Sequence, residues 1–172
     1  MRVYRLLGLI LAAFFCLTGC ERERPDVPSA VVEEMVRAGA AVGGETAGRL
    51  YAADLLSIPP SELNPDAMSD AMIAAAFGQG SEVPDIFARL EAYAVWFCTF
   101  ARPAEYGCFI VSREGDAEET AQMCLQRADM IRKMCGETVY APPPLIMGRC
   151  VFYAIGDGAE NALERARELM RG

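Results

Sequence analysis

The sequence contains no histidine among its 172 residues. This absence excludes Ser-His-Asp and Cys-His nucleophile pairs, zinc or iron held by imidazole, and acid–base catalysis by an imidazole side chain. Carboxylates, thiols and arginines remain, but the most common enzyme designs are not open to this chain. We therefore expect a protein that is not an enzyme and that holds no metal or other cofactor.

Lysine is almost absent as well, since Lys133 is the only one in the chain, and the formal net charge is −8. Recognition of a phosphate backbone needs clustered lysine and arginine side chains. The sequence therefore predicts no nucleic-acid partner. The acidity itself is interpreted as an aid to solubility.

None of the seven cysteines stands in a CxxC pair, so the sequence indicates neither a thioredoxin-like redox pair nor a zinc knuckle. Five of them follow the N-terminal leader described next, and an odd number leaves at least one thiol free or paired between chains. The disulfide pattern stays open at this stage. The five are Cys98, Cys108, Cys124, Cys135 and Cys150.

An apolar run from Leu6 to Leu17 follows Arg2 and Arg5 near the N-terminus. A membrane-spanning helix needs about 20 apolar residues, so this run is too short and is typical of a secretory signal. Its small-residue cleavage site is followed at once by a cysteine, and polar residues come directly after. This is the pattern of a bacterial lipobox, formed by Leu17, Thr18, Gly19 and Cys20.

The lipobox predicts lipidation of Cys20 by a diacylglycerol thioether and cleavage after Gly19. We expect residues 1–19 to be the signal peptide, 20–28 a lipidated tether, and 29–172 one globular α+β domain with its core in 83–170. Removal of 1–19, which carry two arginines and no acid, makes the net charge −10. The predicted location is the extracytoplasmic side of the cell membrane, held by a lipid anchor.

The first part of the domain is predicted to be helical. Ser29 can cap a helix that Gly39 ends, and a second helix is expected from the cap Asn64 and Pro65 to Phe77. Residues 40–63 are ambiguous because they contain several glycines and a proline pair.

From residue 90 onward the apolar period changes to that of a strand. Residues 93–100 are apolar on both faces, which favours a central, covered strand, and a turn at 102–105 leads to a return strand at 107–111. If Pro103 is the centre of the turn, Cys98 and Cys108 lie opposite each other and can form a cross-strand disulfide. The alternative is two buried, reduced thiols.

A long helix is predicted next, opened by Asp116 with Glu119 as the partner in a capping box. Three methionines stand beside its apolar face, where they either pack in the core or line a groove for a peptide or lipid. These are Met123, Met130 and Met134. The residues of the apolar face itself are Ala117, Ala121, Cys124, Ala128, Ile131 and Cys135.

A second hairpin, of residues 145–147 and 150–155, precedes a final helix that Asp157 is expected to cap. The order strand, strand, helix thus occurs twice. We predict an α+β fold with a four-stranded antiparallel sheet built from this ββα repeat, with helices on one face, after the N-terminal helical region.

The chain resembles the bacterial lipoproteins of domain-of-unknown-function family 4358. The resemblance rests on the lipobox leader and on three segments, 90–95, 112–116 and 148–155, which read Leu-Glu-Ala-Tyr-Ala-Val, Ser-Arg-Glu-Gly-Asp and Gly-Arg-Cys-Val-Phe-Tyr-Ala-Ile. It covers the leader and about residues 83–170. It implies a small extracytoplasmic α+β domain of unassigned activity, without established catalytic residues.

We therefore expect a membrane-anchored lipoprotein that binds a small ligand or another envelope protein. The alternatives are an envelope enzyme that uses a cysteine thiolate or carboxylates, and an assembly factor of a membrane complex.

Replacing Cys20 with Ser should release the protein from the membrane or leave its leader uncleaved, because the modified thiol is lost. Fractionation of cells and the mass of the product measure both effects. Unchanged cleavage together with unchanged membrane retention would contradict the lipobox.

Overall fold

The computed structural model describes residues 27–43, 47–56, 66–78, 80–98 and 103–172, and its centre is an antiparallel sheet of five strands. The order of the strands across the sheet is β1-β2-β3-β5-β4. Their bounds are β1 (Gly48–Asp54), β2 (Leu90–Cys98), β3 (Glu105–Val111), β4 (Leu145–Met147) and β5 (Cys150–Ile155).

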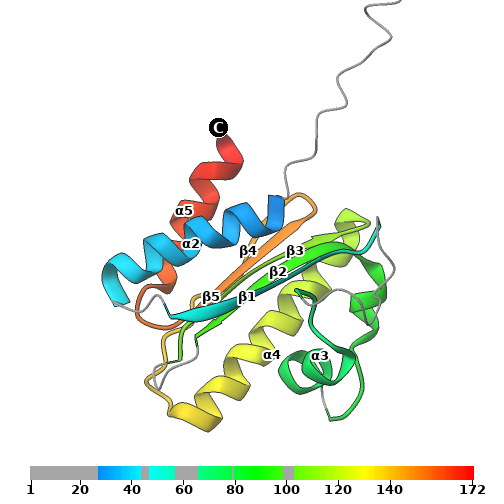
Figure 1. Ribbon diagram of the computed structural model, residues 1–172, viewed down its shortest axis with the longest axis horizontal. Helices are drawn as coiled ribbons and strands as arrows, with labels where there is room; N and C mark the ends of the chain where they lie inside the picture. The colour runs from blue at the N-terminus through cyan, green and yellow to red at the C-terminus, as the bar shows by residue number, and fades with distance from the viewer. Residues whose placement is uncertain (1–26, 44–46, 57–65, 79, 99–102) are drawn as a thin grey trace, which may run out of the picture.

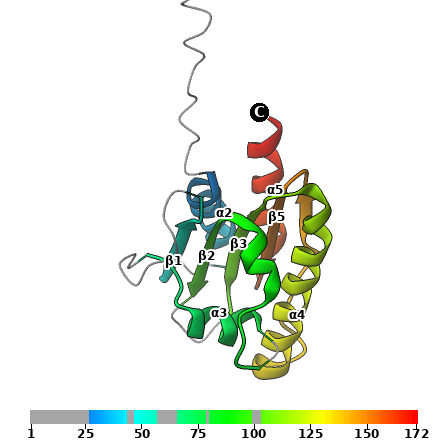
Figure 2. The ribbon, with the colours of Figure 1, turned by 90° about the vertical axis from the view of Figure 1, so that its right-hand side faces the viewer.

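Helices cover both faces of this sheet. On one face lie α2 (Val27–Gly43) and α5 (Ala159–Arg171), and on the other lie α3 (Asp70–Phe77) and α4 (Ala117–Cys135), as Figures 1 and 2 show. The prediction of helices on one face is therefore wrong. The physical reason is that the central strands are apolar on both sides, and each side must be covered.

The α+β class and the antiparallel sheet are confirmed, with one strand more than the four predicted. The additional strand, β1, comes from the segment that was ambiguous in the sequence and pairs with β2. The two strand–strand–helix units do not repeat in space, since α4 and α5 lie on opposite faces of the sheet.

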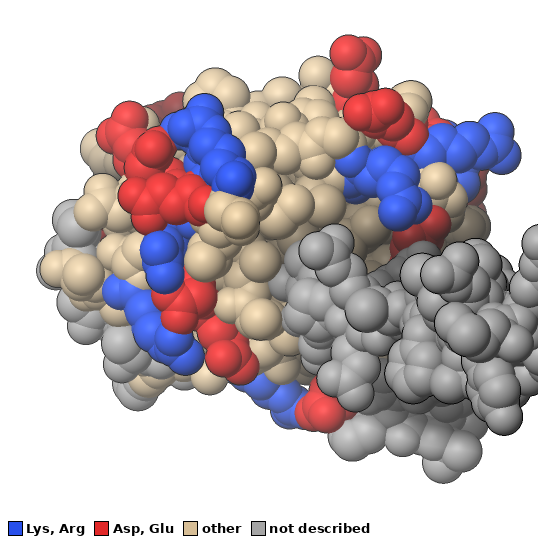
Figure 3. Space-filling model, turned by 90° about the horizontal axis from the view of Figure 1, so that it is seen from above, with Lys and Arg blue, Asp and Glu red and all other residues tan. Residues whose placement is uncertain are grey.

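The α2 helix packs closely on the sheet because it carries a glycine at the contact. A Cβ atom at Gly39 would lie 2.2 Å from the hydroxyl oxygen of Tyr106 on β3. The helix does not end at Gly39, as predicted, but continues to Gly43. Glu34 of α2 and Arg165 of α5 form an ion pair of 2.9 Å, and Figure 3 shows basic and acidic side chains side by side on this face.

On the opposite face, α3 is short. It begins at Asp70, where the Ser69 hydroxyl accepts a hydrogen bond from the Met72 N–H at 3.3 Å. The predicted start near Pro65 is too early, because residues 66–69 are not helical. The predicted cap Asn64 lies outside the described residues. The predicted end at Phe77, followed by Gly78, is confirmed.

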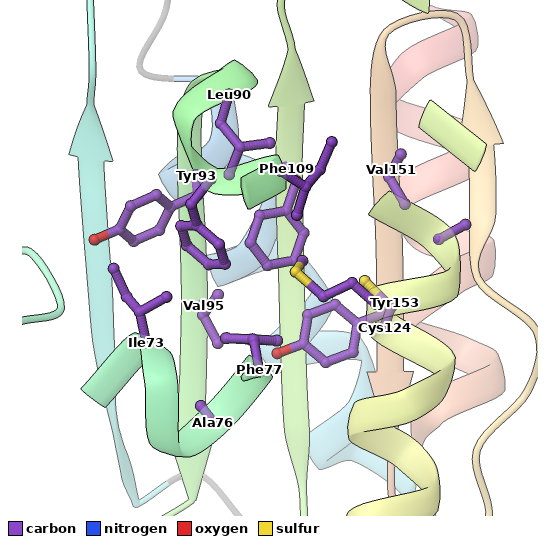
Figure 4. Close-up of a cluster of buried hydrophobic side chains, with 14 of the residues drawn as sticks. Ile73, Ala76, Phe77, Leu90, Tyr93, Val95, Phe109, Cys124, Val151 and Tyr153 are labelled. Carbon is purple, nitrogen blue, oxygen red and sulfur yellow. The ribbon is translucent and has the colours of Figure 1, made fainter. Parts of the chain in front are cut away.

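Aromatic rings form the centre of the core between this face and its helices (Figure 4). The Phe77 ring from α3 meets the rings of Phe109 and Tyr153 edge-on, with centroids 5.5 and 6.1 Å apart. Phe87 of a short 3-10 helix (Asp85–Arg89) adds two further edge contacts, to Tyr93 and to Phe109. Edge-to-face contacts of this kind favour one arrangement of the rings over others.

The β2–β3 hairpin forms as predicted but in another register. Cys108 lies opposite Ala94 rather than Cys98, because the ladder already pairs Phe97 with Glu105. Cys98 and Ala94 are four residues apart on β2, so about 13 Å separate the two cysteines along the strand. This separation excludes the possible disulfide between Cys98 and Cys108, since disulfides need Cα atoms within about 7 Å, and neither cysteine is in a disulfide.

Gly107 in the middle of β3 offers a test of the packing. A Cβ atom there would lie 2.1 Å from Cε1 of Tyr153. We expect Gly107→Ala to lower the free energy of unfolding by about 1–3 kcal/mol, because the Tyr153 ring must move in a packed core.

The matched control for this variant is Gly115→Ala, where an added Cβ has no neighbour within 4 Å. Thermal unfolding of both variants measures the difference. Equal stability of the two would contradict the close contact between β3 and Tyr153.

Candidate functional site

A buried carboxylate marks the candidate site. Glu105, the first residue of β3, is only 4% exposed and is the one acidic residue buried in the described part of the chain. An isolated buried charge is very unfavourable, so such a group needs a partner and hydrogen bonds. The structure supplies both.

The partner of Glu105 is Arg127 on α4. Nε of Arg127 lies 3.0 and 3.1 Å from the two carboxylate oxygens of Glu105, and Nη2 lies 2.7 Å from Oε2. The hydroxyl of Tyr153 on β5 donates a further hydrogen bond, to Oε1 of Glu105 at 2.6 Å. These three side chains, here called the buried charge cluster, join two strands and α4.

The aromatic ring of Phe97 lies against the face of the Arg127 guanidinium. The central carbon of the guanidinium lies 5.7 Å from the centre of the Phe97 ring, and Phe97 is the cross-strand neighbour of Glu105. A cation over a ring face is attracted by the ring's π electrons. The hydrogen bonds to Glu105 therefore fix the direction of the guanidinium, and the Phe97 ring fixes the orientation of its plane.

The protonation states of the buried charge cluster follow from its burial. Burial by itself lowers the pKa of Arg127, but the hydrogen bond and charge of Glu105 outweigh it and raise the pKa. Burial and the neighbouring carboxylate raise the pKa of Tyr153 well above its ordinary value. Arg127 therefore stays charged and Tyr153 stays a neutral donor at neutral pH.

A cleft of about 280 Å³ opens beside this cluster, between the C-terminal end of α3 and the middle of α4. Arg127 forms part of its wall, and Phe77 connects the cleft to the ring of Tyr153. The lining residues are Ala76, Phe77, Gly78, Gln126, Arg127, Asp129, Met130 and Lys133.

Positive charge predominates at the rim of this cleft. Lys133, the chain's only lysine, has no ion pair with any described residue. The one acidic residue of the lining, Asp129, is 2.9 Å from Nη1 of Arg132 and is thereby neutralised. The lining as a whole favours an anion, although the chain is acidic overall.

The three methionines beside the apolar face of α4 have different surroundings. Met123 is buried in the core, Met130 is half-buried in the cleft, and Met134 is 64% exposed. Core packing is thus confirmed for the first, and only the second lies where a ligand could touch it.

A second hollow, of about 210 Å³, lies at the end of the sheet where β5 leads into α5. Cys135, the last residue of α4, borders it together with Tyr140 and Asp157. Cys135 is exposed, so its predicted place in the core is wrong, whereas the predicted burial of Cys124 is confirmed. Ile131 is the last buried residue of α4, so the final turn of the helix, which ends at Cys135, is largely exposed.

Burial raises the pKa of the Cys108 and Cys124 thiols well above the ordinary value, and burial also raises that of Cys150. These three thiols are therefore protonated at neutral pH and are weak nucleophiles. They supply no support for thiolate chemistry.

The predicted capping box at the start of α4 is wrong. No side-chain hydrogen bond from Asp116 caps the helix. Its Oδ1 instead accepts a hydrogen bond of 2.5 Å from Arg89, which also contacts Glu119. The last helix starts one residue later than a cap at Asp157 would give, with Gly158 in the capping position.

The lipobox residues Leu17, Thr18, Gly19 and Cys20 lie outside the described residues, and their role stays a prediction. In the described part of the chain no helix has the length and apolarity to cross a membrane. In the same residues, no three acidic or cysteine side chains come together as metal ligands.

Comparison with models of protein families, with curated proteins and with solved structures finds no match. The resemblance to domain-of-unknown-function family 4358 therefore stays a prediction.

Removing parts of the buried charge cluster should affect stability unequally. Glu105→Gln leaves the Arg127 charge buried without a counter-charge and should lower the free energy of unfolding by about 3–5 kcal/mol. Tyr153→Phe removes one hydrogen bond to a carboxylate and should lower it by about 1–3 kcal/mol.

Thermal unfolding of the full-length protein in detergent measures both effects. A loss for Glu105→Gln no greater than that for Tyr153→Phe would show that the ion pair is not closed as described.

Proposed function

We propose that this chain is a lipoprotein, anchored through Cys20 on the extracytoplasmic side of the cell membrane, whose domain binds a small ligand in the cleft between α3 and α4. The lipobox supports the location. The cleft beside the buried charge cluster supports the binding function.

The observation that carries the binding function is the buried pair of Glu105 and Arg127. A buried ion pair is a poor source of stability, because apolar residues of the same volume often stabilise a fold as well or better. What the pair does provide is a guanidinium fixed in direction and plane at the wall of a cleft. A group fixed in advance binds a ligand without loss of side-chain freedom.

An anchor at Cys20 is compatible with an open cleft. Six residues lie between Cys20 and the start of α2 at Val27, so the chain reaches at most about 25 Å from the lipid to the domain. The α2 helix lies on one face of the sheet, and the cleft lies on the other. A ligand can therefore enter the cleft without displacing the helix that follows the anchor.

Labelled methionine methyl groups give a direct test, because Met130 and Met134 lie one turn apart on α4 and only Met130 lines the cleft. Full-length protein in detergent is mixed with a set of small organic compounds and followed by methyl NMR. Compounds that bind should shift the Met130 resonance and leave that of Met134 in place.

Two matched variants complete the test. Met130→Trp fills the cleft and should weaken binding of any such compound by at least about tenfold, which corresponds to about 1.4 kcal/mol. Titration calorimetry measures this affinity, because the variant no longer has the Met130 methyl group. Met134→Trp makes the same change outside the cleft and should leave binding unaltered. If no compound shifts Met130, or if both variants bind equally, the cleft is not the binding site.

A further inference from the structure

The guanidinium of Arg127 has an unused donor edge. It carries five N–H groups in one plane, of which Nε–H and one Nη2–H are directed at Glu105. The planar geometry directs the other Nη2–H, and one N–H of Nη1, away from Glu105 as a second pair of parallel donors. No described residue accepts a hydrogen bond from Nη1.

A pair of parallel donors of this kind matches the two oxygens of a carboxylate. The charge of the lining agrees with this geometry. Glu105 offsets the charge of Arg127, Arg132 offsets that of Asp129, and the charge of Lys133 is left over. One uncompensated positive charge suits a group with one negative charge better than a phosphate with two.

The rest of the lining is apolar. Ala76, Phe77 and Met130 supply it, and the volume of about 280 Å³ is at the lower limit of ordinary ligand sites. The space therefore suits a short branched or straight hydrocarbon group rather than a long chain or a fused ring system.

We propose that the cleft ligand is a carboxylate joined to a short apolar group. The outer edge of Arg127 and the ammonium of Lys133 bind its oxygens, and Phe77 and Met130 contact its apolar part. Glu105 acts as a positioning residue that holds the guanidinium for this contact. The inference rests on the proposed function, since it names the class of ligand for the same cleft.

The test compares three compounds of nearly equal shape and different charge on the full-length protein in detergent. They are 3-methylbutanoate, 3-methylbutanamide and 3-methylbutylammonium, each titrated against the Met130 methyl resonance. The acid should bind at least about tenfold more tightly than the amide, because it replaces neutral hydrogen bonds by charge-assisted ones. The ammonium compound and inorganic phosphate should bind more weakly still.

A carboxylate can come from a free acid or from the C-terminus of a peptide, and one further arm separates the two sources. N-acetyl-alanyl-valine presents the same carboxylate at the end of a peptide. Tighter binding of this peptide than of 3-methylbutanoate assigns the site to chain ends, and weaker binding assigns it to free acids. Either result supports a carboxylate ligand.

Variants of the exposed Lys133 test its role without disturbing the core. Lys133→Gln should weaken binding of the acid about three- to tenfold and leave binding of the amide unchanged. Lys133→Arg should bind the acid as tightly as the unaltered protein does. Arg113→Gln is the control, because it removes the same charge from an exposed residue before the opposite end of α4.

The possible failures can be told apart. If the amide or the ammonium compound shifts Met130 as strongly as the acid, the carboxylate assignment is overturned and the proposed binding function stands. If binding of the acid is indifferent to Lys133→Gln, the two-cation contact is overturned. If none of these compounds shifts Met130, the carboxylate assignment is overturned, and the proposed function fails as well only if no compound of the broader set shifts that resonance.

Discussion

The buried ion pair between Glu105 and Arg127 is the constraint on which the α4 side of the molecule depends. The pair is favourable only when it is complete, because either charge alone would be strongly unfavourable in the core. The closed pair fixes the position of α4 along its axis and its rotation relative to β3. The hydrogen bond from the Tyr153 hydroxyl to Glu105 ties β5 to the same arrangement. The cleft owes its shape to this positioning, since α4 provides most of its lining.

The helices pack on the two faces of the sheet in different ways. On the α4 side, large rings and the charge cluster fill a wide space between sheet and helices. On the α2 side, small residues let the helices approach closely, with Gly39 against Tyr106 and against Gly158 before α5. The cleft lies on the α4 face, where the short helix α3 ends beside α4.

The sequence predicted elements better than their relations in space. Strands and helices from residue 90 onward lie close to where apolar periodicity placed them, because burial dictates that pattern. Register failed at the β2–β3 turn: the predicted centre, Pro103, is two residues beyond the centre that the ladder shows, and this misplaced Cys108. The buried charge cluster was missed because its members are distant in sequence. A signal existed, since Arg127 follows Cys124 by one turn on the core side of α4.

The two outer strands of the sheet affect how closely copies of this domain can lie to one another. β4 has only three residues and follows three consecutive prolines. β1 begins with Gly48 and Arg49 and ends at Asp54. Short strands, prolines and charges at a sheet's margins discourage pairing with the backbone of a neighbouring chain. Anchoring confines proteins to a thin layer, where their local concentration is high. Under the proposed anchoring at Cys20, such strand margins would let many copies of the domain lie close together without joining into a continuous sheet.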